Sequence, residues 1–113
     1  MSLLYLANGE IRLTPFYDLV CTRAIERIDD HLAFAVGDER NPSVVTRKNW
    51  ESLALQCDIR PQCLLNQIDD IATRLLNNLA LARTTFESQY GPYPALQRIE
   101  KIVSKQCQRA KEI

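Results

Sequence analysis

The stretch from Pro61 to Gln89, PQCLLNQIDDIATRLLNNLALARTTFESQ, carries the strongest periodic signal in the chain. Its apolar residues recur at spacings of three and four, which places them on one face of a helix. Such a helix would be ~40 Å long at 1.5 Å per residue. It is the predicted axis of the fold, with a solvated opposite face. The apolar stripe comprises Leu64, Leu65, Ile68, Ile71, Ala72, Leu75, Leu76, Leu79, Ala82 and Phe86, and the opposite face Asp69, Asp70, Arg74, Asn77, Asn78 and Arg83.

Shorter helices are predicted on both sides of this axis. Pro61 suits a first helical turn, and the segment 90–94, YGPYP, ends the long helix with a glycine and blocks its continuation with proline. Upstream, Thr46 is a plausible N-cap for a helix that carries Trp50 into the core. Downstream, a last helix runs from about Pro94 to Lys111. Its inward residues are Leu96, Ile99, Ile102, Val103, Cys107 and Ala110, and its outer side carries Arg98, Lys101, Lys105 and Arg109. This basic stripe could meet phosphate or an acidic partner, but cations near a helix C-terminus also suit a plain solvated face.

The N-terminal residues predict a β-hairpin. Two strand-like segments, Leu3–Ala7 and Glu10–Thr14, flank Asn8-Gly9, a pair that suits a two-residue type I′ turn. That turn would place Leu6 opposite Ile11 and Leu4 opposite Leu13. A lone two-stranded ribbon is marginal in water. We therefore expect a hairpin that has lost its cover by truncation, and that is mobile or buried in a homodimer contact.

The segment 26–45 is the least regular part of the sequence. Asp29-Asp30-His31 reads as a solvated turn, and Leu32–Val36 as a short buried strand or extended run that ends at Gly37. The predicted fold class is mainly α, in a single domain over residues 1–113. The hairpin occupies about 3–14 and the helical body about 16–113.

Composition narrows the classes of partner. Fourteen basic and fourteen acidic residues give a net charge of zero, so no global field favours nucleic acid or an anionic membrane. No apolar run approaches the ~18 residues of a membrane span, and we expect a cytoplasmic protein. The cysteines lack the close pairing of a zinc site and are expected to be free thiols packed as small hydrophobes. They are Cys21, Cys57, Cys63 and Cys107.

Asp18 is the candidate metal ligand. It lies in RLTPFYDLV, from Arg12 to Val20, where Pro15 ends the second strand. Taken from the residues alone, Asp18 suits two roles. It could cap a turn or helix over Leu19–Ile25, or it could act at a strand end as a hard oxygen ligand for Mg²⁺.

LTPFYDLV resembles the LxPxYDL signature of the HipA family, the kinase-like toxins of bacterial toxin-antitoxin pairs. Two later segments resemble family segments in the same order: HLAFAVGDE at 31–39 and VTRKNWESLALQCDIRP at 45–61. The sequence departs from the family pattern where Asp38 replaces the second glycine of a pair, and where His31 stands at a position often occupied by a basic residue. The resemblance implies the helical C-lobe of a kinase-like fold, in which Asp18 binds the Mg²⁺ that bridges the ATP phosphates.

The resemblance also implies what this chain lacks. The family carries its catalytic loop, of the form DxHxKN, just ahead of such a hairpin, and its ATP-binding lobe earlier still. Neither is among these 113 residues, so we expect no catalytic residue, no bound ATP or Mg²⁺ and no activity in this chain alone. The implied partners are an antitoxin of the HipB type and a protein substrate. The alternative is a non-catalytic helical module for protein interaction.

Overall fold

The structure, a computed structural model, describes residues 2–16 and 19–113. Within these residues the body consists of three α-helices: α1 (Arg47–Gln56), α2 (Pro61–Tyr90) and α3 (Pro94–Lys111). Two short antiparallel strands, β1 (Leu3–Tyr5) and β2 (Ile11–Leu13), and one 3₁₀ turn, η1 (Thr22–Ala24), precede them. The prediction of a mainly helical chain with an N-terminal hairpin is confirmed.

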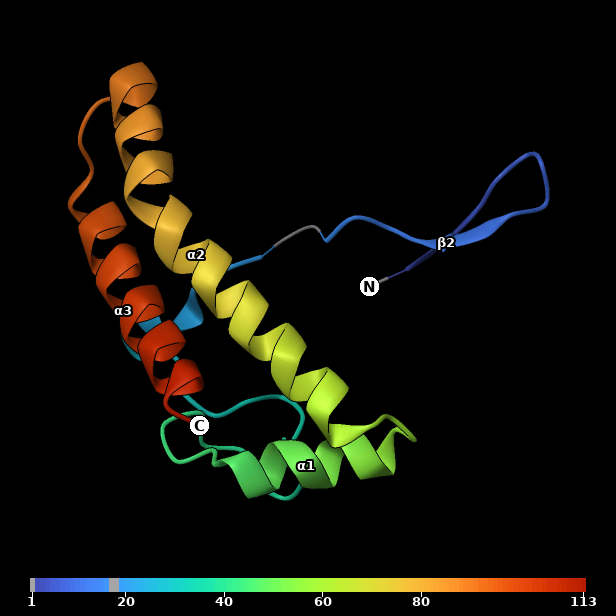
Figure 1. Ribbon diagram of the computed structural model, residues 1–113. Coiled ribbons are helices and arrows are strands. Elements are labelled where there is room, and N and C mark those ends of the chain that lie inside the picture. The colour runs from blue at the N-terminus through green and yellow to red at the C-terminus, as the bar shows by residue number, and fades with distance from the viewer. Residues whose placement is uncertain (1, 17–18) are drawn as a thin grey trace.

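Helices α2 and α3 lie side by side, and α1 crosses the N-terminal end of α2 (Figure 1). The sharp reversal between α2 and α3 depends on Gly91, whose φ of +86° follows the last turn of α2. Its N–H donates to the carbonyl oxygen of Glu87 at 2.9 Å. Pro94 then occupies the first turn of α3. The predicted ends of both helices agree with the structure to within one residue.

An ion pair contradicts part of the predicted solvated face of α2. Arg83 turns toward α3, where its Nε lies 2.7 Å from Oε2 of Glu100, and both side chains are about three-quarters buried. Further along, Lys111 of α3 donates to Asp69 at 2.9 Å and to Thr73 at 2.6 Å. Polar contacts therefore join the two helices near both ends of α3.

Thr46 is the N-cap of α1, as predicted, and Asn49 completes a capping box with it. The Oδ1 of Asn49 accepts hydrogen bonds from the backbone N–H of Thr46 at 2.8 Å and from its hydroxyl at 2.7 Å. The amide nitrogen of Asn49 donates to Asp38 at 3.0 Å. Gly37, with φ of +65°, lies so close that a Cβ there would come 2.8 Å from the carbonyl oxygen of Asn49. The loop before α1 is thus held against its first turn.

That loop does not contain the predicted strand at Leu32–Val36. Val36 and Glu39 form an isolated bridge, with N–H···O distances of 2.8 and 3.1 Å, around the two-residue turn at Gly37. One further backbone hydrogen bond crosses the reversal, from the N–H of Leu32 to the carbonyl oxygen of Arg40 at 2.8 Å, but no residue from Leu32 to Val36 belongs to a strand. Val36 is buried, whereas Phe34 is 87% exposed.

The hairpin forms, but its predicted register is wrong by one residue. The N–H of Leu6 donates to the carbonyl of Glu10 and that of Gly9 to the carbonyl of Leu6, which closes a three-residue loop. In this loop Gly9 alone has a positive φ, +81°. A three-residue loop with glycine in the left-handed region is the next commonest hairpin solution after the two-residue turn. The resulting pairs are Leu3 with Leu13, Leu4 with Arg12 and Tyr5 with Ile11.

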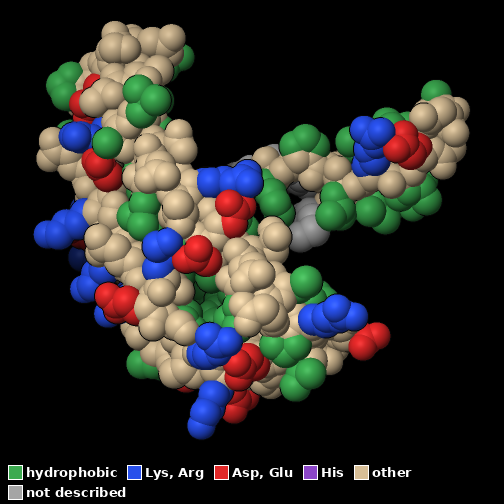
Figure 2. All heavy atoms as spheres, in the orientation of Figure 1, with side chains coloured by type: hydrophobic (Ala, Val, Ile, Leu, Met, Phe, Trp, Pro, Cys, Tyr) green, Lys and Arg blue, Asp and Glu red, His purple; other side chains and the backbone are tan. Residues whose placement is uncertain are grey.

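This register gathers Leu3, Tyr5, Ile11 and Leu13 on one face of the hairpin. The hairpin projects away from the helical body (Figure 1), and neither strand contacts a helix. Apolar side chains lie along it in the open (Figure 2). All four residues of this face are more than half exposed. We call them the hairpin face.

The helical body buries little apolar surface. Its buried hydrophobic residues are small: Ala24, Val36, Ala54, Ala72 and Cys107. The predicted stripe of α2 is only partly covered, since Ile71, Leu75 and Phe86 remain exposed. The chain exposes 9019 Å², against ~6,300 Å² for a compact monomer of this size. Its radius of gyration of 16.6 Å likewise exceeds the ~13 Å of a compact domain.

Candidate functional site

Asp18, the predicted metal ligand, lies outside the described residues. The helix that it could cap over Leu19–Ile25 does not form, because the single helical turn in that stretch begins at Thr22. Cys21 occupies the N-cap position there, without a side-chain hydrogen bond. In the described part of the chain, no three His, Cys, Asp or Glu residues cluster as metal ligands.

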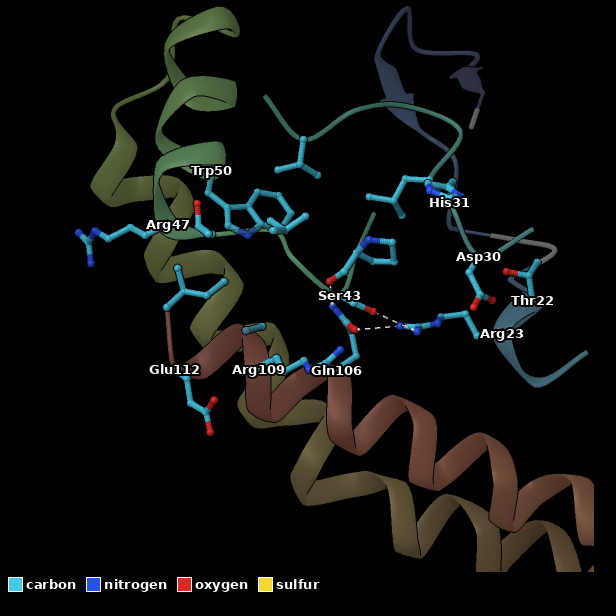
Figure 3. Close-up of a pocket in the computed structure, with 17 residues that line it drawn as sticks. Thr22, Arg23, Asp30, His31, Ser43, Arg47, Trp50, Gln106, Arg109 and Glu112 are labelled. Carbon is cyan, nitrogen blue, oxygen red and sulfur yellow. Dashed lines mark hydrogen bonds between the residues drawn. The ribbon is translucent and has the colours of Figure 1, made fainter. Parts of the chain in front are cut away.

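A cavity lies away from this segment, between η1, the loop before α1, α1 itself and the C-terminal end of α3 (Figure 3). Its volume is about 690 Å³, within the range of small-molecule sites. The lining mixes apolar, aromatic and basic side chains. It comprises Thr22, Arg23, Asp30, His31, Leu32, Val36, Pro42, Ser43, Val45, Thr46, Arg47, Trp50, Gln106, Arg109, Ala110, Glu112 and Ile113.

A hydrogen-bond network around Arg23 builds one wall of the cavity. Its two Nη atoms donate to Oε1 of Gln106 at 3.3 Å and to the hydroxyl of Ser43 at 3.2 Å (Figure 3). Gln106 in turn donates to the carbonyl oxygen of Pro42 at 3.1 Å. The network joins η1, the loop and α3. Because both acceptors of Arg23 are neutral, its charge has no counterion among the described residues.

Arg109 and Trp50 contribute the other notable side chains. Arg109 is half-buried and lines the cavity, so the prediction that it lies on the outer side of α3 is wrong. Within the described residues its side chain has no hydrogen-bond or ion-pair partner. Trp50 was predicted to lie in the core, but it is only half-buried. Its ring points toward the cavity (Figure 3).

The remaining charges lie at the rim. Arg47 is neutralised by Glu51, whose Oε1 lies 2.8 Å from its Nε. Asp30 and Glu112 are exposed. A smaller hollow of about 210 Å³ adjoins the cavity and shares Arg47 with it. The interior of the main cavity is therefore more basic than its edge.

The predicted turn at Asp29-Asp30-His31 is present. Oδ1 of Asp29 accepts from the backbone N–H of His31 at 2.9 Å and lies 2.7 Å from its Nδ1. The backbone hydrogen bond, and next the imidazole, lower the pKa of the Asp29 carboxyl. These residues are exposed, as expected of a solvated turn.

The four cysteines are free. Cys107 is buried and Cys21 half-buried, in line with packing as small hydrophobes, whereas Cys57 and Cys63 are exposed. Burial raises the pKa of the Cys107 thiol, which keeps it protonated and unreactive.

No family model, no curated protein and no solved structure matches the chain. Across the described residues, no helix is long and apolar enough to cross a membrane. The role of the cavity is therefore inferred from its own residues and geometry.

Sequence reasoning missed Arg23, Ser43 and Gln106 as parts of one site. Gln106 did give a signal, since it is a polar residue four positions after Ile102 and four before Ala110 on the apolar stripe of α3. A polar residue on a buried stripe needs a partner. The partners lie more than 60 positions away, which no local pattern reveals.

Proposed function

We propose that the chain is the helical C-terminal part of a HipA-like serine/threonine protein kinase from a toxin-antitoxin pair. The observation that carries this proposal is the order of three segments: LTPFYDLV, HLAFAVGDE and VTRKNWESLALQCDIRP. The structure supports treating the last two as one unit, because Gly37 and Asp38 of the second contact Asn49 of the third. A hairpin followed by a helical body supports it further.

In the complete kinase, Asp18 would hold the Mg²⁺ that bridges the ATP phosphates, and the metal would neutralise charge that develops during transfer. Phosphoryl transfer also needs a catalytic aspartate, a second metal ligand, a phosphate-binding lysine and a cover over the nucleotide. We assign none of these to the present residues. The 113-residue chain alone is thus proposed to be inactive, with an antitoxin of the HipB type and a protein substrate as partners of the whole kinase.

A second candidate is a non-catalytic module that binds another protein. The exposed hairpin face and the surface of 9019 Å² favour it, because a contiguous apolar patch is typical of an interaction site. The same surface would also be covered by the rest of a kinase. The encoding reading frame separates the two: an upstream Asp-x-x-x-Lys-Asn supports the kinase, and an in-frame start near Met1 without it supports the module.

The direct test is phosphate transfer by the protein encoded by the whole reading frame. We expect autophosphorylation from labelled ATP with Mg²⁺, and its loss in Asp18→Asn. Asp58→Asn, at an exposed carboxylate in the turn between α1 and α2, is the matched control and should retain transfer. Full-length protein without activity, or with activity unaffected by Asp18→Asn, would contradict the proposal.

The isolated chain provides the second arm of this test. Millimolar Mg-ATP should give no thermal shift, because one carboxylate without its partner ligands does not hold the metal–nucleotide complex. A clear stabilisation that Asp18→Ala abolishes would show that the site is complete in these residues.

A further inference from the structure

We propose that the cavity beside Trp50 binds a small molecule that joins a flat ring to a phosphate group, the chemistry of a mononucleotide. This inference is independent of the kinase proposal, since Asp18 takes no part in it. Its basis is the combination of two half-buried arginines, Arg23 and Arg109, and one indole ring around a cavity of about 690 Å³. Neither arginine has a counterion among residues 2–16 and 19–113.

The arginines define the charged part of the ligand. Arg23 is held by Gln106 and Ser43, so its guanidinium is positioned in advance while its charge stays uncompensated. Arg109 reaches the same cavity from α3. Guanidinium groups suit phosphate because its several oxygens accept from more than one of them at once. A phosphate therefore fits two arginines from separate elements better than a carboxylate with two oxygens.

The apolar lining defines the rest of the ligand. Trp50 directs its ring toward the cavity (Figure 3), and Val36 and Pro42 line it as well. Indole stacks favourably on flat rings of any base. A cavity of about 690 Å³ is larger than phosphate alone would need, and it accommodates a ring and a sugar-sized linker.

The rim sets a limit on the charge of the ligand. Asp30 and Glu112 line the cavity from exposed positions, and each would repel additional phosphate groups. This arrangement favours a monophosphate over a triphosphate. The proposed ligand of this cavity therefore differs from Mg-ATP.

Trp50 is the single tryptophan of the chain, so its fluorescence reports on this cavity. The experiment titrates the 113-residue chain with AMP, adenosine, inorganic phosphate and ATP in the presence of EDTA. We expect a saturable change with AMP, half-complete at roughly 10 µM to 1 mM. Adenosine and phosphate lack one half of the ligand each and should bind at least about tenfold more weakly. ATP should also bind more weakly than AMP.

Arg109→Gln should weaken AMP about tenfold, the loss of one charge-assisted contact. Arg98→Gln is the matched control, because Arg98 is exposed on the same helix and does not line the cavity. Asp30→Asn should tighten AMP about twofold, which gives a readout should Arg109→Gln fold poorly. The proposal is overturned by no saturable response up to about 10 mM AMP, by adenosine, phosphate or ATP binding as tightly as AMP, or by equal affinity in the two arginine variants.

Discussion

Gly37 shows how one residue fixes a junction. Its φ of +65° lies in the left-handed region, and the space where a Cβ would stand is occupied by the backbone of Asn49, 2.8 Å away. The neighbouring Asp38 binds the side chain of Asn49. Both contacts hold the loop against α1, and that loop supplies Ser43 to the cavity. The glycine thus supports the site without touching it.

Gly37→Ala should lower the free energy of unfolding by about 2–4 kcal/mol. The left-handed conformation accounts for ~1–2 kcal/mol of this, and the clash with a helix backbone adds the rest. Gly9→Ala is the matched control, because Gly9 has φ of +81° in the hairpin loop with no atom within 4 Å of its Cβ position. It should cost only ~1–2 kcal/mol. Urea denaturation of both variants measures the difference, and equal losses would show that the close approach is not a constraint.

For single residues, the sequence predicted local conformation better than it predicted which distant residues each side chain contacts. The turn at Asp29-Asp30-His31 was foreseen, because an Asp side chain satisfies the backbone two residues on. Arg109 was misplaced because a cation in the last turn of a helix is normally solvated. The cavity that receives it exists only once η1 has packed against α3.

The ends of helices were predicted most accurately where a single proline or glycine determines them. Pro61, Gly91 and Pro94 mark the ends of α2 and α3, because proline and glycine act on the backbone directly. The hairpin register failed because Asn8-Gly9 is compatible with both a two-residue and a three-residue loop. The hydrogen bonds from the N–H of Leu6 to Glu10 and from the N–H of Gly9 to Leu6 decide between them.

The contact between α2 and α3 gives a prediction of its own. Arg83→Met should destabilise the chain by about 1–3 kcal/mol, because it leaves the largely buried carboxylate of Glu100 without its partner. Arg74→Met on the same helix removes an exposed pair with Asp70 and should cost less than ~0.5 kcal/mol. Thermal denaturation compares the two. Adding Glu100→Gln to Arg83→Met should recover part of the loss, and equal costs for the two arginines would refute the role of burial.

At the scale of the whole molecule, the chain covers itself poorly. Its surface exceeds that of a compact monomer by about 2,700 Å², and no large side chain of the described residues is fully buried. Periodicity identified which residues of α2 are apolar, but it could not show that α1 and α3 leave Ile71 and Leu75 uncovered. An obligate interface buries about 2,000–5,000 Å² in total, so the excess is sufficient for one.

The hairpin face is the part of that surface that no helix packs against. This leads to a prediction about self-association. A two-stranded ribbon is marginal without packing, so its amides should exchange freely in a monomer and slowly where a second copy covers Tyr5 and Ile11. Light scattering and hydrogen exchange over a range of about 1–500 µM should therefore show mass and the protection of Leu4–Leu13 rising together. Ile11→Lys should abolish both, whereas Arg12→Lys, on the opposite face, should leave both unchanged. Strong protection of these amides in a monomer would mean that the hairpin is stable by itself.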